Sequence, residues 1–352
     1  RWWEAAERPE AELLAVMKHV RFAAMAEGFL RETVGAWPAL DSKGGRDLLF
    51  NAVLPLAGGT KPVPRWGLGP RLIYVVGGHS GRGGRLSTVD LYDLQNASWK
   101  QLASMAGPRS SHGCVALEGK LYAVGGLGAT TQALDTAEVY DPQTDGWQPL
   151  AKMTTERCVL GLAAVGGKIY AIGGWSAESA LESVEAYDPQ LGSWALVASM
   201  SEKRKGHASV MLDGKIYTMG GCGDSGDNLD TVEVYDPQAD SWQRVASMPQ
   251  GRSGHAAAAM GGKIYVTGGT LGSSASPVFV YDPQADAWTP LANMSIARHS
   301  HAAAAVDGKL YVFGGYDRGP LSTVEVYDPV SDNWAQGSSL TSARESVVAA
   351  AL

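Results

Sequence analysis

Residues 252–269 read RSGHAAAAMGGKIYVTGG, and residues 277–294 read PVFVYDPQADAWTPLANM. Together they hold four short apolar runs separated by turn residues, a pattern typical of β-strands rather than helices. The unit therefore predicts a four-stranded antiparallel sheet. Its first run, AAAAM at 256–260, has only small residues before its methionine, and AAAAV at 302–306 and VVAAA at 347–351 correspond to it. Small side chains are expected where the innermost strands of several sheets crowd one axis.

The markers of this unit recur along the chain, and their period decides the architecture. Successive Gly-Gly pairs end 48, 48, 47, 48 and 46 residues apart, at Gly78, Gly126, Gly174, Gly221, Gly269 and Gly315. An arginine keeps the same phase, at Arg109, Arg157, Arg204, Arg252, Arg298 and Arg344. A tyrosine followed by Asp and a later tryptophan also recur, and we interpret these aromatic residues as filling between sheets. We expect the arginines to bond turn carbonyls, with ligand contact as a secondary role.

The phase of the repeats at the two ends predicts how the sheets close into a ring. The first unit begins directly at its second strand, RLIYVVGG from Arg71, and the chain ends on an unaccompanied first strand at 344–352. We expect this C-terminal strand to be innermost in the first sheet, because a closed ring leaves no exposed edge. The predicted fold of residues 71–352 is therefore an all-β, six-bladed propeller.

Composition narrows the classes of function. Acidic residues exceed basic ones, and the formal charge of −7 excludes a general basic footprint for nucleic acid. No apolar stretch is long enough to cross a membrane, and no secretory signal is apparent. Three cysteines without CxxC spacing indicate neither a disulfide framework nor a zinc site, so we expect a reducing, cytoplasmic location. No GxSxG, P-loop or HExxH motif appears in a suitable context, so we predict a non-enzyme without a cofactor.

The Gly-Gly, Tyr-Asp-Pro and Trp markers resemble Kelch repeats, which build β-propellers; the first copy departs from them with YDLQNASW. Residues 1–54 show apolar residues at helical spacing. Their stretch LLAVMKHVRFAAMAEGFLRETV resembles the C-terminal half of a BACK domain, which joins a BTB domain to the propeller in the Kelch-like (BTB-BACK-Kelch) family. An unrelated helical cap is the alternative. Residues 55–70, rich in proline and glycine, are expected to form a semi-rigid linker.

The resemblance implies a non-catalytic substrate receptor of a cullin-RING ubiquitin ligase, which binds a peptide of its target protein on one propeller face. The cullin would be bound through a BTB domain that this chain lacks, and we expect an upstream part because the chain begins at Arg1. A Kelch scaffold that binds actin or another structural protein, without ubiquitin transfer, is the alternative. A propeller enzyme is disfavoured, because neither copper ligands nor a carboxylate-lined pocket can be assembled from the sequence.

In Kelch-like receptors the residue after the Gly-Gly pair, the one or two residues after the in-phase arginine, and the loop between the second and third strands line the peptide-binding face. The resemblance carries the first two sets onto individual residues of this chain. The first set follows the Gly-Gly pair: His79, Leu127, Trp175, Cys222, Thr270 and Tyr316. The second set follows the in-phase arginine: Ser110, Ser111, Cys158, Lys205, Ser253, His299, Ser300 and Glu345. Serines, aromatic faces and few charges suit a peptide with apolar anchors and polar ends. Only Lys205 is clearly basic near the centre, so a strongly acidic peptide is not favoured over a mixed one.

Four histidines sit three residues after an in-phase arginine: His112, His207, His255 and His301. Imidazoles gathered around an axis are one way to hold a transition metal. A residue that recurs with the repeat more often serves packing, and equivalent atoms of neighbouring blades lie too far apart to share an ion. We therefore predict no metal site.

Overall fold

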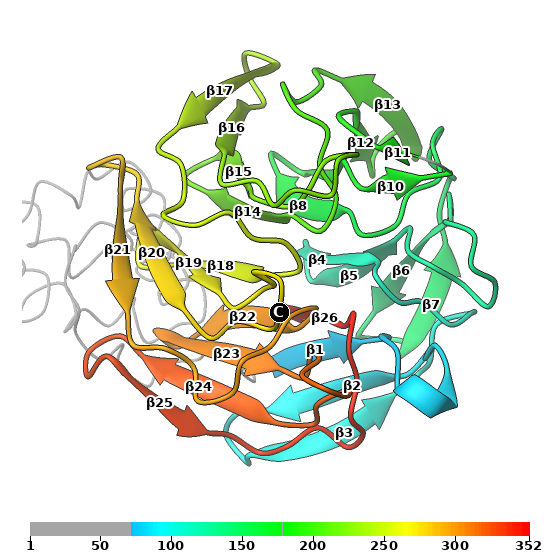
Figure 1. The fold of residues 1–352 in the computed structure, drawn as a ribbon. Helices are drawn as coiled ribbons and strands as arrows, with labels where there is room; N and C mark the ends of the chain where they lie inside the picture. The colour runs from blue at the N-terminus through cyan, green and yellow to red at the C-terminus, as the bar shows by residue number, and fades with distance from the viewer. Residues whose placement is uncertain (1–71, 178) are drawn as a thin grey trace, which may run out of the picture. The chain divides into compact units, whose positions relative to one another are not determined.

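The computed structural model describes residues 72–352 except residue 178, and its strands form six four-stranded antiparallel sheets around one axis (Figure 1). The six-bladed propeller predicted from the repeats is thus confirmed. The BACK-like segment predicted over residues 1–54 and the linker predicted over residues 55–70 lie outside the described residues.

Each blade is numbered here by its order along the chain, and its strands are given from the axis outward. Blade 1 contains β26 (Val348–Ala351), β1 (Leu72–Val76), β2 (Val89–Asp93) and β3 (Ser98–Leu102); blade 2 contains β4 (Gly113–Leu117), β5 (Lys120–Val124), β6 (Ala137–Asp141) and β7 (Gly146–Pro149). Blade 3 contains β8 (Gly161–Val165), β9 (Lys168–Ile172), β12 (Val184–Asp188) and β13 (Ser193–Val197); blade 4 contains β14 (Ala208–Leu212), β15 (Lys215–Met219), β16 (Val232–Asp236) and β17 (Ser241–Val245). Blade 5 contains β18 (Ala256–Met260), β19 (Lys263–Thr267), β20 (Val278–Asp282) and β21 (Ala287–Leu291); blade 6 contains β22 (Ala302–Val306), β23 (Lys309–Phe313), β24 (Val324–Asp328) and β25 (Asn333–Gln336).

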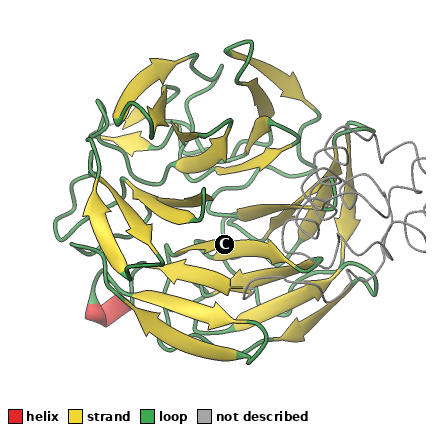
Figure 2. Ribbon diagram, turned by 180° about the vertical axis from the view of Figure 1, so that it is seen from behind, coloured by secondary structure: helices red, strands yellow, loops and turns green. Residues whose placement is uncertain are grey.

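Two short elements stand outside the blades. A two-stranded hairpin of β10 (Trp175–Ser176) and β11 (Ser179–Ala180) interrupts blade 3 between its second and third strands. A single 3-10 turn, Gly81–Gly83, occupies the corresponding loop of blade 1, and it is the one helical element drawn among the described residues in Figure 2.

The ring closes where the last strand joins the first blade. β26 pairs antiparallel with β1, in a register that places Ile73 opposite Ala351 and Val76 opposite Val348. The innermost strand of every blade contacts the innermost strands of both neighbouring blades, and the C-terminus lies near the centre of the ring (Figure 1). Alanine and valine predominate in these strands, as the crowding of six backbones predicts, although β8 also accommodates Leu162 and β14 accommodates Met211 and Leu212.

Aromatic side chains connect neighbouring blades, in agreement with their predicted role. Each repeat tryptophan donates its indole N–H to a backbone carbonyl of the preceding blade, over N···O distances of 2.8–3.2 Å. Ring centroids of each tryptophan and its cross-strand tyrosine are 4.7–5.3 Å apart. The closing seam is packed in the same way, since Phe313 and Ala302 of blade 6 join Ile73 and Tyr92 of blade 1 in one apolar cluster.

The in-phase arginines are buried and bond the carbonyl of the first glycine of a Gly-Gly pair, which confirms their predicted structural role. The Arg157 guanidinium, for example, is fully buried and donates to Gly173 O at 2.9 Å. Five of the six also form an ion pair that the repeat pattern had not led us to expect: Arg109–Glu138, Arg157–Glu185, Arg204–Glu233, Arg298–Glu325 and Arg344–Asp90. Arg252 has Phe279 in place of the acid, with Cζ 4.9 Å from the ring centroid. Removing one partner of such a buried pair typically costs about 3–5 kcal/mol.

A closed circle of backbone hydrogen bonds surrounds the axis at the mouth of the propeller. It is formed by the second residue after each in-phase arginine, and we call it the central belt: Ser111, Val159, Gly206, Gly254, Ser300 and Ser346. Each belt residue donates its N–H to the carbonyl of the belt residue in the preceding blade, at 2.7–3.0 Å. All six adopt a positive φ, between 50° and 64°. The belt thus ties the six blades together with bonds that lie outside their sheets.

The Gly-Gly pairs are required because neighbouring backbone passes too close for any side chain: the next repeat at the first glycine, as Arg204 O does at Gly173, and the same repeat at the second. At Gly174, where φ is +101°, an added Cβ would lie 2.7 Å from Cys158 O. At Gly192, where φ is +64°, an added Cβ would meet nothing within 4 Å. Alanine at Gly192 would therefore show the free-energy cost of a positive φ alone, whereas alanine at Gly174 would add the cost of a steric clash.

We predict that Gly174→Ala lowers the free energy of unfolding by about 3 kcal/mol or more, since strain and a backbone clash add. Gly192→Ala is the matched control and should cost only about 1–2 kcal/mol, the strain of a left-handed alanine. Urea denaturation of both variants measures the difference. Equal losses would show that the close approach of Cys158 O to Gly174 does not constrain the fold.

Candidate functional site

The two predicted sets of site residues meet in pairs at the mouth of the propeller. In every blade, the residue after the Gly-Gly pair forms an isolated β-bridge with the residue after an in-phase arginine. The bridges are His79–Glu345, Leu127–Ser110, Trp175–Cys158, Cys222–Lys205, Thr270–Ser253 and Tyr316–His299. A repeated backbone arrangement therefore presents six pairs of unlike side chains around one opening.

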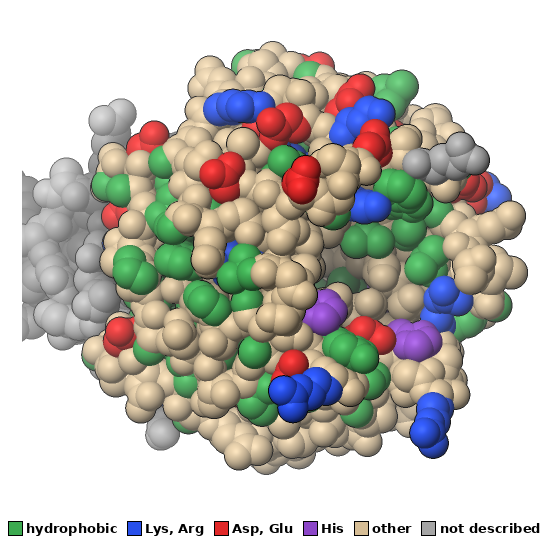
Figure 3. Space-filling model, in the orientation of Figure 1, with side chains coloured by type: hydrophobic (Ala, Val, Ile, Leu, Met, Phe, Trp, Pro, Cys, Tyr) green, Lys and Arg blue, Asp and Glu red, His purple; other side chains and the backbone are tan. Residues whose placement is uncertain are grey.

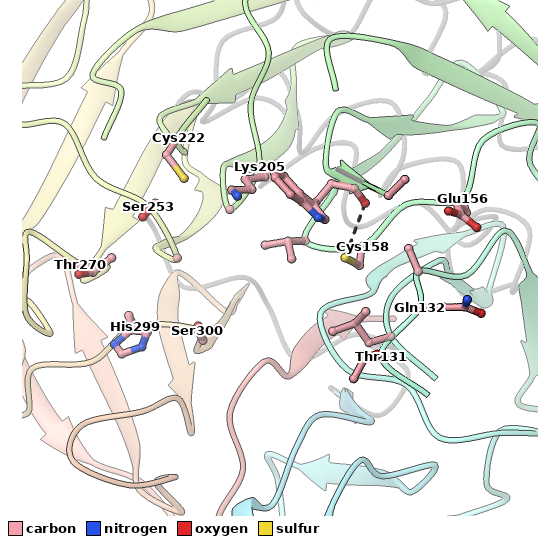
Figure 4. Close-up of a pocket in the computed structure, with 17 residues that line it drawn as sticks. Thr131, Gln132, Glu156, Cys158, Lys205, Cys222, Ser253, Thr270, His299 and Ser300 are labelled. Atoms are coloured by element: carbon pink, nitrogen blue, oxygen red, sulfur yellow. Dashed lines mark hydrogen bonds between the residues drawn. The ribbon is translucent and has the colours of Figure 1, made fainter. Parts of the chain in front are cut away.

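A pocket of about 820 Å³ opens at the centre of this face, which we call the central pocket. Figure 3 shows the hollow, with histidine and basic side chains on its rim. Nine of the fourteen predicted site residues line it: Leu127, Cys158, Trp175, Lys205, Cys222, Ser253, Thr270, His299 and Ser300. Figure 4 shows Lys205 and Cys158 on one side of the pocket and Ser253, Thr270, His299 and Ser300 on another.

Three predicted residues outside the pocket lining interact with one another or with its edge. His79 Nδ1 lies 3.5 Å from Glu345 Oε1, so these two side chains neutralise each other when the imidazole is protonated. The Tyr316 ring lies 5.4 Å from the His299 ring, between centroids. These side chains therefore form the part of the rim that belongs to blades 1 and 6.

The remaining two predicted residues have structural partners. Ser110 is only 3% exposed, and its hydroxyl accepts a hydrogen bond from Arg85 Nε at 3.2 Å. Ser111 belongs to the central belt, where its N–H and carbonyl are both engaged. Neither residue lines the central pocket, although both lie beside residues that do.

Eight lining residues were not among the predicted ones: Thr131, Gln132, Ala133, Glu156, Val159, Ala177, Gly206 and Gly254. Val159, Gly206 and Gly254 hold the same repeat position as Ser111 and Ser300, so the repeat phase contained the signal that identifies them. Thr131 and Ala177 lie in loops between second and third strands, a region that the Kelch resemblance implies for the face. The repeat phase could not identify individual residues there, because these loops differ in length.

Lys205 and Trp175 form the most distinctive contact in the pocket. Lys205 Nζ lies 3.4 Å from the centroid of the Trp175 ring, a cation–π arrangement. The bridge between Cys158 and Trp175 brings the Cys158 thiol beside them, where it donates to Trp175 O over 3.6 Å. Burial raises the pKa of the Cys158 thiol, so this sulfur is held in its neutral form.

The four in-phase histidines lie below the mouth and are packing groups. Each is at most 6% exposed, and the equivalent positions of blades 3 and 1 carry Leu160 and Val347, which are also buried. His207 Nε2 accepts a hydrogen bond from Gly161 N at 3.1 Å. Among the described residues, no group of three His, Cys, Asp or Glu side chains is arranged to hold a metal ion.

Comparisons with known proteins agree with this architecture. A family model described as the Attractin/LZTR1 beta-propeller matches residues 73–345, well over half of the chain. The structure titled "Structure of YjhT" superposes with a TM-score of 0.64 at 18% identity, covering 71% of this chain and 89% of that one. At that identity the likeness concerns the fold alone. No curated protein sequence gives a significant match, and none of the described helices is long and apolar enough to cross a membrane.

We predict that stability falls as the pH drops below about 6.5, because the histidines are buried in neutral form. Burial, followed by repulsion from Arg109, lowers the pKa of His112 to about 3, against 6.5 for an ordinary histidine. The unfolded chain therefore binds more protons between these pH values, and unfolding becomes easier as the pH falls through that window. His112→Leu, which copies the residue that blade 3 carries as Leu160, should reduce the slope of unfolding free energy between pH 6.5 and 5. If the pH dependence of the unfolding free energy were unchanged in His112→Leu, His112 would not be buried in its neutral form.

Proposed function

The chain belongs to the Attractin/LZTR1 β-propeller family, and from this membership we propose that it is a non-catalytic receptor that holds a peptide segment of a target protein in the central pocket. One observation carries the proposal: six repeated bridges place side chains that leave the repeat pattern around a single opening of about 820 Å³. The scaffold needs the bridges but does not dictate which side chains they carry. Such a combination suits recognition, in which a rigid frame presents variable contacts.

The chemistry of the lining supports a peptide as the ligand. Trp175 and Leu127 offer apolar surface, Ser253 and Thr270 offer hydroxyl groups, and Lys205 offers one positive charge. Aromatic residues in a partly enclosed pocket are frequent hot spots of protein recognition, and neighbouring hydroxyls can bond peptide groups.

We extend the proposal to an adaptor of a cullin-RING ubiquitin ligase acting in the cytoplasm. This part rests on the BACK-like sequence of residues 1–54, which precedes the propeller as in Kelch-like adaptors. The cullin would bind a BTB domain outside this chain, while the propeller selects the target. Co-purification of a cullin with the full-length protein tests the adaptor role. Co-sedimentation with actin filaments, without any cullin, would instead support the scaffold alternative.

We predict that Trp175→Ala weakens binding of peptides selected on the full chain by about tenfold or more, with little change in melting temperature. The physical reason is that Trp175 is half-buried at the pocket, outside the apolar seams between blades. Peptides are obtained by selection from a displayed random library, and their affinities are measured by fluorescence anisotropy.

A seam tryptophan provides the matched control for this substitution. Trp147 donates its indole N–H to Ala103 O at 3.0 Å and packs on Tyr140, so Trp147→Ala should lower the melting temperature by several degrees. A large loss of stability in Trp175→Ala would place Trp175 in the core. Unchanged peptide affinity in that variant would refute the pocket as the binding site.

A further inference from the structure

Lys205 differs from nearly all other described lysines in having no carboxylate partner. Seven of them form ion pairs with aspartates: Lys120, Lys152, Lys168, Lys203, Lys215, Lys263 and Lys309. Lys100 and Lys205 are the two described lysines that form none. Lys100 is exposed on the outer strand β3, whereas Lys205 is half-buried in the pocket lining. Asp224 is close enough for the Lys205 charge to help lower its pKa, but its ion pair is with Lys203 and it forms none with Lys205. A half-buried ammonium group without a direct ion-pair partner favours an anionic group from outside the chain.

A second cation reinforces the positive potential on this side of the pocket. Arg85 uses its Nε to donate to Ser110, and its terminal nitrogens form no hydrogen bond or ion pair among the described residues. The charges of Lys205 and Arg85 both oppose the rise in the pKa of Cys158 that burial causes, while Glu156 adds to it. Both cations therefore act on the pocket wall at Cys158, where Glu156 is the opposing acid, while Asp224, the other acid near Lys205, is paired with Lys203.

The walls of the pocket differ in polarity. Leu127, Val159 and Trp175 form an apolar wall contributed by blades 2 and 3. Ser253, Thr270 and Ser300 line the opposite part, from blades 5 and 6, and Figure 4 shows them across the cavity from Cys158. A ligand that contacts Lys205 can thus place an apolar group on one wall and hydrogen-bonding groups on the other.

We infer that the central pocket selects a peptide segment with a single carboxylate side chain, which pairs with Lys205, next to an apolar residue, which packs on Leu127 and Val159. This inference rests on the proposed function and specifies its ligand. A carboxylate fits better than a phosphate, because the backbone N–H groups at the mouth that could surround a dianion are occupied. Gly206 N, for example, donates to Val159 O, and Ser300 N donates to Gly254 O.

The test compares peptides selected from a displayed random library on the full chain with their carboxamide variants, in which Asp or Glu becomes Asn or Gln. We expect the wild-type protein to lose about tenfold in affinity for the carboxamide peptide, equivalent to about 1.4 kcal/mol. Lys205→Met keeps the apolar stem over Trp175 and removes the charge, so it should bind both peptides equally. Lys205→Arg should retain the preference, and Lys100→Met, the control lysine, should behave as wild type.

Each outcome tests either the inferred carboxylate preference or the proposed peptide-binding function on which it rests. Selected peptides that lack acidic residues, or a wild-type protein indifferent to the carboxamide exchange, would overturn the inference and leave a peptide receptor. A library that yields no binding peptide would remove the proposed function itself. Tighter binding of a selected peptide synthesised with phosphoserine in place of its Asp or Glu would overturn the carboxylate assignment. The wild-type comparison needs no protein variant, so it decides the question even if Lys205→Met were unstable.

Discussion

The central belt is the constraint on which the rest of the propeller mouth depends. Its six residues donate and accept in a closed circle, so each backbone must take a left-handed turn at the same height on the axis. That turn directs the preceding residue into its bridge with the residue after a Gly-Gly pair. Even Val159 adopts a φ of 53°, which is unfavourable for a β-branched residue and which the hydrogen-bonded neighbours on both sides sustain.

The buried ion pairs hold the arginines that lie two residues before the belt residues. In blades 2, 3, 4 and 6 the glutamate both pairs with arginine and accepts a backbone N–H from the residue after a methionine that recurs in phase, as Glu233 does from Ser201. Blade 5 departs in both respects, since Phe279 replaces the acid and Pro249, which has no N–H, replaces the donor. Because blade 5 lacks both the acid and the backbone N–H that would donate to it, this site leaves neither a carboxylate without its donor nor an N–H without its acceptor. Arg252 still has unpartnered Nε and Nη2 atoms, and burial lowers its pKa to about 10.

The fold was more predictable from sequence than the site, for a physical reason. Gly-Gly, Tyr-Asp and Trp recur because every blade must solve the same packing problem, so periodicity alone predicted six sheets and the pairing of β26 with β1. The acids beside the arginines also recur, two residues before five of the six repeat tyrosines, yet a charged residue on a strand is easily taken for a solvent-facing one. Pocket residues such as Thr131 and Ala177 come from loops whose conformations the repeat does not determine.

Because of this division, the side chains that line the central pocket can differ without loss of the bonds that hold the ring. Bridges, belt and glycine pairs use backbone atoms, whereas Lys205, Trp175 and Ser253 contribute their side chains to the central pocket. Substitution at such positions leaves the backbone bonds in place, so ligand preference can change while the ring persists. The fold therefore tolerates the ammonium group of Lys205 over the Trp175 indole. This group loses water at a single contact at the mouth and is not buried in a seam between blades.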